Sequence, residues 1–184
     1  MSIKVFISGS IKTKTLHSTH KKRLKNIVAN GFDIIIGDAN GADFAVQKTL
    51  YSLRYENVVI YHTSDKPRNN VGGWETRPIQ PTKKLKGALL HQEKDKAMVS
   101  IADYALVIWD GESIGSIVNA YRMSLSGKQS LIITDSGVEH RILKLDDILR
   151  VILGFEPALR EKLLKRLSAE EREPVTSAPQ LKLI

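Results

Sequence analysis

The chain contains no cysteine, which excludes disulfides and thiolate zinc sites. Its five histidines are scattered, and none belongs to an HxH or HExxH pair typical of metal sites. No apolar run approaches the roughly 18 residues that span a bilayer. The first nine residues lack the basic leader and cleavage site of a signal peptide. We therefore expect a cytoplasmic protein with no metal, no cofactor and no membrane contact.

Aromatic residues are also scarce, at 6% of 184 residues, whereas the net charge is +8. A basic surface attracts nucleotides, nucleic acid or other polyanions. However, the aromatic platforms on which single-strand binders stack bases are missing. The basic cluster at residues 20–25 falls on a predicted amphipathic helix, with Leu24, Ile27 and Val28 facing inward, and indicates a solvated helix face.

Short apolar runs alternate with amphipathic segments over the first 134 residues. Strands are predicted at 3–8, 33–36, 58–61, 104–109 and 130–134, and helices at 18–30, 42–54, 91–101 and 115–126. This alternation predicts an α/β fold: a doubly wound parallel sheet of at least five strands with helices on both faces. Residues 63–90 show neither period and predict a long loop, which is more often functional or disordered than a mere connector.

After the last predicted strand the pattern becomes helical. Residues 145–154 and 157–167 predict two helices, a short helical appendage, and the tail from Glu170 reads as flexible. The predicted organisation is a sheet domain at 1–140, an appendage at 141–169 and a tail at 170–184. The apolar stripe of the second helix must be buried on its own sheet domain or on a second copy, so a homodimer is an alternative; the stripe consists of Leu159, Leu163, Leu164 and Leu167.

A glycine turn follows the second predicted strand. Ile34–Ile36 form the strand, Gly37 and Gly41 bracket the turn, and a helical pattern begins at Ala42. Free backbone N–H groups at such a helix start favour an anion, usually a phosphate. A plain strand-to-helix turn is the structural alternative.

In an open α/β sheet, ligands bind at the carboxyl ends of the strands. Four segments rich in Gly, Ser, Asp and Asn gather there: Ser8–Ser10, Gly37–Asp43, the 63–90 loop, and Asp110–Ser116. We expect them to form one ligand site. Its predicted binding residues are Ser8, Gly9, Ser10, Gly37, Asp38, Asn40, Gly41, Arg68, Trp74, Lys94, Gly111, Gly115 and Ser116.

Individual residues within this set have specific expected roles, each with an alternative. Gly115 allows close approach of a ligand, and Ser116 either holds a phosphate or caps the following helix. Asp38 can bond a ribose hydroxyl, whereas Asp43 more readily satisfies local backbone N–H groups.

In the long loop, Arg68 or Arg77 can grip a phosphate and Trp74 can stack on a base, unless Trp74 packs on the core. Lys94 can point from its helix into the site.

The assembled segments resemble the SLOG superfamily, a Rossmann-like group that includes the LOG phosphoribohydrolases and the DprA/Smf and YspA-like proteins. The resemblance covers roughly residues 3–135. It rests on Ile7–Ser10, on Gly37–Asp43, which is similar to a GGARGAD-type turn, on Lys94 with Met98 and Ala102-Asp103, and on Gly111 with Gly115-Ser116. It implies a pocket for a nucleotide or nucleotide-derived ligand.

Two departures from the LOG enzymes bear on activity. Val118-Asn119 stand where the catalytic glutamates of the LOG motif lie, and Lys94 stands where those enzymes have an arginine. The resemblance therefore implies ligand binding, as a sensor or an orphan enzyme, rather than glycosidic hydrolysis.

Two other functions stay open. Hydrolysis or transfer at an N-glycosidic bond needs a carboxylate near the anomeric carbon. The candidates for it are Asp38, Glu75 and Glu112, with Glu93 and Asp110 as further acids. Single-stranded nucleic-acid binding of the DprA type is the third alternative, prompted by the net charge.

Overall fold

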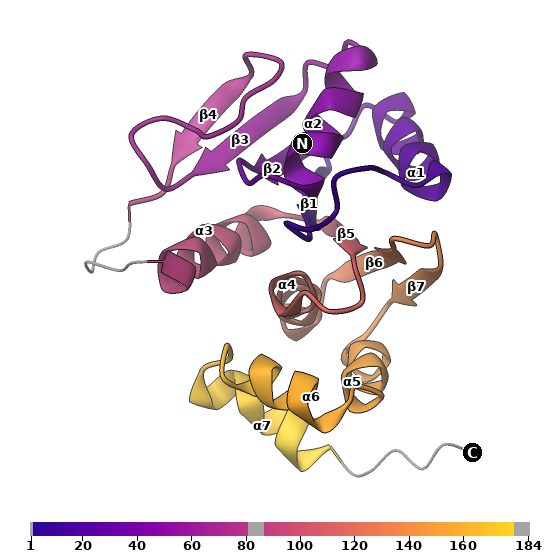
Figure 1. Ribbon diagram of the computed structural model, residues 1–184, viewed down its shortest axis with the longest axis vertical. Helices are drawn as coiled ribbons and strands as arrows, with labels where there is room; N and C mark the ends of the chain where they lie inside the picture. The colour runs from indigo at the N-terminus through magenta and orange to yellow at the C-terminus, as the bar shows by residue number, and fades with distance from the viewer. Residues whose placement is uncertain (1, 81–86, 179–184) are drawn as a thin grey trace.

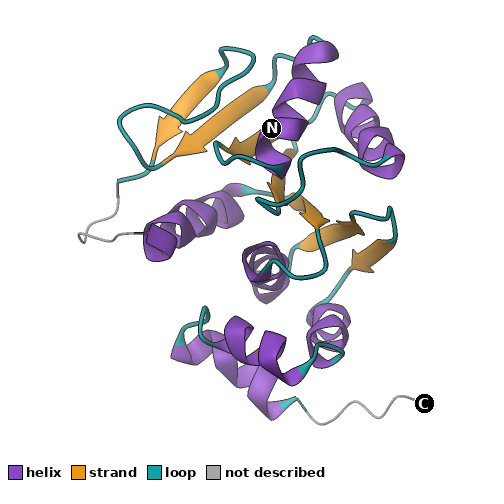
Figure 2. Ribbon diagram, viewed as in Figure 1, coloured by secondary structure: helices purple, strands orange, loops and turns teal. Residues whose placement is uncertain are grey.

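The computed structural model describes residues 2–80 and 87–178, and these form an α/β fold around one seven-stranded sheet (Figures 1 and 2). The strand order is β4-β3-β2-β1-β5-β6-β7, with β7 antiparallel to β6 and all other neighbours parallel. The strands are β1 (Lys4–Gly9), β2 (Asp33–Gly37), β3 (Val58–His62), β4 (Glu75–Pro78), β5 (Tyr104–Trp109), β6 (Gln129–Thr134) and β7 (Glu139–Ile142). The predicted doubly wound sheet is confirmed.

Helices cover both faces of the sheet, as the sequence predicted (Figure 1). α1 and α2 lie on one face with a core that includes Leu24, Leu50 and Ile34. α3 and α4 lie on the other, with Phe6 and Tyr121 in their core. The helices are α1 (Ser18–Ala29), α2 (Ala42–Ser52), α3 (Gly87–Ile101), α4 (Ile114–Leu125), α5 (Leu145–Leu153), α6 (Pro157–Leu164) and α7 (Ala169–Ser177). Within these described residues, no helix is both long and apolar enough to cross a membrane.

The central strands are continuous apolar runs because both of their faces are covered. Ile34, Ile35 and Ile36 alternate between the two cores, and all three are buried. The same holds for Leu106 and Val107 in β5. Such runs are typical of parallel strands that lie between two helix layers.

The long loop predicted at 63–90 contains regular structure. Glu75–Pro78 form the edge strand β4, and α3 begins at Gly87; residues 81–86 lie outside the described part of the chain. All four β4 residues are exposed, so the strand has no buried face and its sequence lacks the alternation of apolar and polar residues that predicts a strand. β7 was also missed, and it extends the sheet past the predicted domain boundary at residue 140.

The C-terminal segment corrects a second prediction. The chain from Glu170, expected to be flexible, forms α7 up to Ser177, and Val175 is buried; residues 179–184 lie outside the description. α5, α6 and α7 form a further layer against α4, seen at the bottom of Figure 1. Leu163 and Leu167 of the apolar stripe are buried in this chain's own core, so these two side chains are not available to a second copy.

Candidate functional site

The site lies where the winding of the sheet reverses. The chain leaves β1 towards β2 on one side, whereas β5 on the other side leads away to β6. The loops after β1 and β5 therefore diverge, and this geometry opens a crevice at the carboxyl edge of the sheet. A cleft of about 590 Å³ occupies that position. Eight predicted binding residues line it: Ser8, Gly9, Ser10, Gly37, Arg68, Lys94, Gly115 and Ser116.

The end of β1 is fixed closely against α2. The Ser10 amide donates to the Ile108 carbonyl at 3.0 Å, and the Ser10 carbonyl accepts from the Ala42 amide at 2.9 Å. A Cβ at Gly9 would clash with that of Ala42, so the glycine permits this close approach. The Ser8–Ser10 turn is therefore held in place by the elements on both sides of it.

The loop after β5 is organised by the Asp110 carboxylate. It accepts hydrogen bonds from the Ser10 hydroxyl at 2.6 Å, the Ser113 amide at 2.7 Å and the Glu112 amide at 3.0 Å. Burial raises the pKa of Asp110, but these hydrogen bonds outweigh it and lower the pKa to about 2. Asp110 therefore shapes the loop as an anion, and it is not among the residues that line the cleft, where a carboxylate near the anomeric carbon would have to lie.

The N-terminus of α4 borders the cleft without a side-chain cap. Ser113 is the N-cap residue, yet its hydroxyl bonds to Asp110 rather than to a first-turn amide. Ser116 lies inside the first turn, so its predicted alternative as the cap is wrong. A Cβ at Gly115 would meet no atom of the described residues within 4 Å. The first turn of α4 therefore offers backbone donors and open space to an anion.

The floor of the cleft contains a buried amide. Asn119 donates from Nδ2 to the Ser8 hydroxyl at 2.9 Å and to Asp95 Oδ2 at 3.1 Å. Its Oδ1 is buried without a hydrogen-bond partner among the described residues. Asn119 thus links the end of β1 to a carboxylate on α3.

A network of charged groups lies beside this amide. Asp38 accepts from Arg68 Nη2 at 2.8 Å and from the Arg68 amide at 3.0 Å, and Lys94 Nζ lies 3.7 Å from it. Burial raises the pKa of Asp38, but the bonds from Arg68 and the charge of Lys94 lower it to about 2. Asp38 therefore orients Arg68 at the cleft wall, while Asp38 itself, which the sequence predicted to bond a ribose, is not among the lining residues.

Two other carboxyl groups line the cleft itself. Burial raises the pKa of Asp43 to about 6, although Lys94 and the Ala39 amide oppose that change. Burial likewise raises the pKa of Asp95, against the charge of Lys94 and a hydrogen bond from Asn119. The Asp43 carboxylate accepts from the Ala39 amide at 3.1 Å, which confirms the local backbone role expected for it.

The shift at Asp43 predicts a pH dependence of stability. Its pKa is higher in the folded state than the value of 3.8 in the unfolded chain, so its contribution is complete below about pH 4 and is lost as pH rises through 6. Relative to Asp43→Asn, the free energy of unfolding of the wild type should fall by about 2 kcal/mol between about pH 4 and about pH 7. Urea unfolding at a series of pH values measures this difference. Asp65→Asn, on an exposed loop, is the control; equal curves for both variants would contradict the prediction.

Several predicted site residues lie elsewhere. Trp74 is buried in the core beneath α2 and donates from Nε1 to the Tyr55 carbonyl at 2.9 Å, so it cannot stack on a ligand in the cleft. Asn40 bonds to Asn69, and Gly41 packs on the backbone of Ile11.

The loop glycine and three of the predicted acids also lie away from the cleft lining. Gly111 occupies an exposed turn with φ +86°. Glu112 pairs with Lys12 at 2.6 Å, Glu75 with Arg77 at 2.9 Å, and Glu93 with Lys96 at 2.9 Å, each outside the lining residues. The acids predicted for catalysis, other than Asp38 and Asp110, are thus engaged in surface ion pairs.

Other lining residues were missed by sequence reasoning. His91, Gln92 and Asp95 come from α3, and Lys162, Lys165 and Arg166 come from α6 and the turn after it. The only sequence signal for the last three is their alternation with leucines, which indicates an amphipathic helix and not what its polar side faces. Among the described residues, no group of three or more His, Asp or Glu side chains is arranged to hold a metal ion.

Comparison with known proteins adds no assignment to this geometry. The chain matches no protein-family model. A search of curated proteins also finds no match. The similarity to the SLOG superfamily therefore stays a prediction that rests on the residues named for it, and the fold and the cleft are the basis for any functional proposal.

Proposed function

We propose that this protein binds a nucleotide or a nucleotide-derived small molecule in the cleft between β1 and β5, as a sensor or an orphan enzyme. The observation that carries the proposal is the uncapped N-terminus of α4 facing the same cleft as Lys94 and Arg68. Backbone donors at a helix start and nearby cations together favour a phosphate. The hydroxyls of Ser8 and Ser10 and the unpartnered Oδ1 of Asn119 add polar groups suited to a ribose or base.

The cleft also has the size and position of a small-molecule site. Its volume of about 590 Å³ falls within the range of roughly 300–1,000 Å³ that ligand pockets occupy. Phe6, Ile7, Met98 and Ile114 supply apolar surface beside the polar groups. A few placed polar groups on an apolar wall are typical of sites that orient a ligand.

Thermal unfolding with nucleoside mono-, di- and cyclic phosphates tests the proposal. At 100 times its Kd, a ligand stabilises the folded state by about 2.7 kcal/mol, which raises Tm by roughly 5–10 °C. Gly115→Asp should abolish this shift because its carboxylate would repel the phosphate. An acidic residue in the first turn does not destabilise a helix, so the free variant should unfold no earlier than the wild type.

Gly115→Ala is the matched control, since a Cβ there meets no atom of the described residues. It should keep the Tm of the free protein and most of the ligand-induced shift. A wild type that shows no shift with any nucleotide at millimolar concentration would contradict the proposal. So would a Gly115→Asp variant that retains the full shift.

A second candidate function is hydrolysis or transfer at an N-glycosidic bond. It is favoured by the two carboxyl groups of raised pKa that line the cleft, Asp43 and Asp95. A protonated carboxyl can donate to a leaving base, and a carboxylate can stabilise an oxocarbenium-like transition state. Single-stranded nucleic-acid binding has less support, because Trp74 is buried.

Release of free base from a nucleotide tests the enzymatic candidate. Asp95→Asn should lower the rate by at least about 100-fold, the contribution typical of a general acid or base. Glu93→Gln, on the same helix but paired with Lys96, should leave the rate unchanged. An equal loss in both variants, or no release of base from any nucleotide, would contradict this candidate.

A further inference from the structure

A second group of cationic side chains lines the cleft, and it comes from the C-terminal helices rather than from the sheet domain. Lys162, Lys165 and Arg166 line it from α6 and the turn that follows; we call these three residues the α6 basic edge. They are spaced three and four positions apart, so they share one side of the helical segment. The sheet domain contributes Arg68 and Lys94 to the same cleft. Cations thus approach the cleft from two separate layers of the fold.

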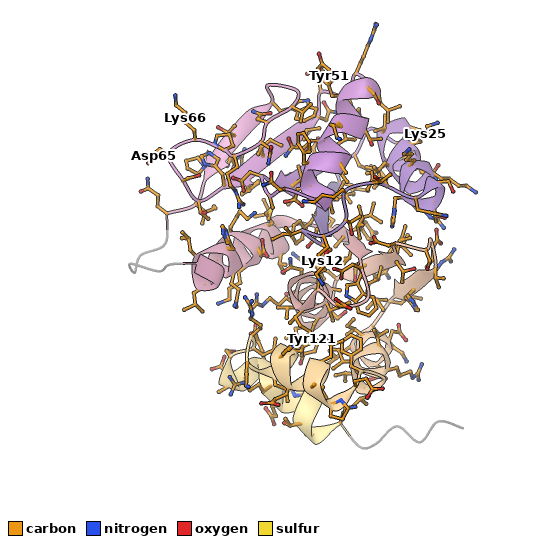
Figure 3. All side chains as sticks on the ribbon, in the orientation of Figure 1. Lys12, Lys25, Tyr51, Asp65, Lys66 and Tyr121 are labelled. Atoms are coloured by element: carbon orange, nitrogen blue, oxygen red, sulfur yellow. The ribbon has the colours of Figure 1, made fainter. Side chains whose placement is uncertain are left out.

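Core packing fixes the direction in which this edge faces. Leu163 and Leu167 are buried in the core that also contains Ile117 and Tyr121 of α4. Figure 3 labels Tyr121 at the junction between α4 and the C-terminal helices. The apolar side of α6 is therefore buried against α4, and the three cations that flank it line the cleft together with the first turn of α4.

The charges near the sheet are largely compensated, whereas two of the three on the α6 basic edge have no counter-charge among the described residues. Arg68 pairs with Asp38, and Lys94 lies within 4 Å of both Asp38 and Asp95. On α6, Lys165 pairs with Glu161 on the exposed surface, and within the described residues no ion pair involves Lys162 or Arg166. A counter-charge is therefore missing on this wall of the cleft.

We propose that the ligand carries more than one phosphate, with one bound at the N-terminus of α4 and another at the α6 basic edge. This inference rests on the proposed function and specifies its ligand class. The chemistry is a second phosphate on a nucleotide, either consecutive, as in ADP, or on another position of the ribose, as in adenosine 3′,5′-bisphosphate. Charge-assisted bonds to a phosphate make such a ligand bind at least about tenfold tighter than the corresponding monophosphate.

The test compares three ligands on three proteins by isothermal titration. The ligands are AMP, ADP and adenosine 3′,5′-bisphosphate, and the same three-ligand comparison is repeated with each of the other common bases. The variants are Lys162→Ala/Lys165→Ala/Arg166→Ala and, as the control of equal charge change, Lys21→Ala/Lys22→Ala/Lys25→Ala. The control residues are exposed on α1, where Figure 3 labels Lys25. If the first variant unfolds earlier than the wild type, Lys162→Glu alone replaces it.

The wild type should bind one of the two bisphosphorylated ligands at least about tenfold tighter than the monophosphate. The α6 variant should lose this advantage while its affinity for the monophosphate changes less than about twofold, and the α1 variant should keep it. The ligand that binds more tightly than the monophosphate identifies the position of the second phosphate. The inference is overturned if the monophosphate binds and a second phosphate does not increase the affinity, or if the increase persists in the α6 variant. Either result leaves the proposed function intact. Absence of binding by every nucleotide overturns both.

Discussion

Replacing Gly41 with alanine is expected to destabilise the protein by more than about 3 kcal/mol. Gly41 has φ +89° and ψ −129°, a conformation that L-residues rarely adopt, and a Cβ there would clash with the backbone of Ile11. A backbone obstacle cannot rotate away as a side chain can. The loss corresponds to a fall in Tm of roughly 6–12 °C, measurable by calorimetry or by circular dichroism.

Gly31→Ala separates the two causes of this loss. Gly31 also has a positive φ, of +66°, but a Cβ there meets no atom of the described residues within 4 Å. Its replacement should cost about 1 kcal/mol, the cost of the left-handed backbone alone. Similar losses in the two variants would contradict the role assigned to Ile11, since they would show that its loop moves aside freely.

Replacing Arg122 with methionine is expected to destabilise the protein by about 3–5 kcal/mol. Arg122 is buried on α4, and its Nε lies 2.7 Å from Oε1 of Glu171 on α7. Burial raises the pKa of Glu171, but the bond from Arg122 helps to outweigh it and the pKa is lowered. The Tyr121 hydroxyl donates to the Glu171 carbonyl at 2.7 Å, so two neighbouring residues of α4 hold the same point of α7. Loss of the arginine leaves a partly buried carboxylate without its counter-charge. Urea unfolding measures the loss, and limited proteolysis after Arg166 detects release of α7.

Two further variants test the cause. Glu171→Gln in the Arg122→Met background removes the unpaired charge and should recover part of the lost stability. The guanidinium of Arg122 also donates from Nη2 to Oε2 of Glu171 at 3.2 Å. Arg122→Lys keeps the charge but cannot make both of these bonds, and its stability should lie between those of the wild type and Arg122→Met. A single Arg122→Met variant within about 1 kcal/mol of the wild type would show that α7 is held by its apolar contacts alone.

The sequence predicted where the candidate site lies, but not which side chains contact one another within it. Parallel strands bring their carboxyl ends to one edge, so Ser8–Ser10 and Asp110–Ser116 were expected together, and Ser8, Ser10, Gly115 and Ser116 all line the cleft. The chemical roles of the site carboxylates depend on side chains that are far away in the sequence. Asp38 is 30 residues from the arginine that binds it, and Asp95 is 24 residues from Asn119. Local spacing carries no information about such pairs.

The sequence by itself determined the class of fold, because strands buried between two helix layers must be apolar throughout and the covering helices must be amphipathic. The strands at Ile34–Ile36 and at Tyr104–Trp109 illustrate this. Only the tertiary structure decided the elements whose stability comes from distant contacts. β4 is fully exposed and pairs with β3, while α7 contains Pro174 and is anchored by Arg122 of α4. It also decided that Trp74 is buried and that Lys162 and Arg166 face the cleft. A side chain's neighbours depend on how layers pack, and this packing is set by the whole chain rather than by any local period.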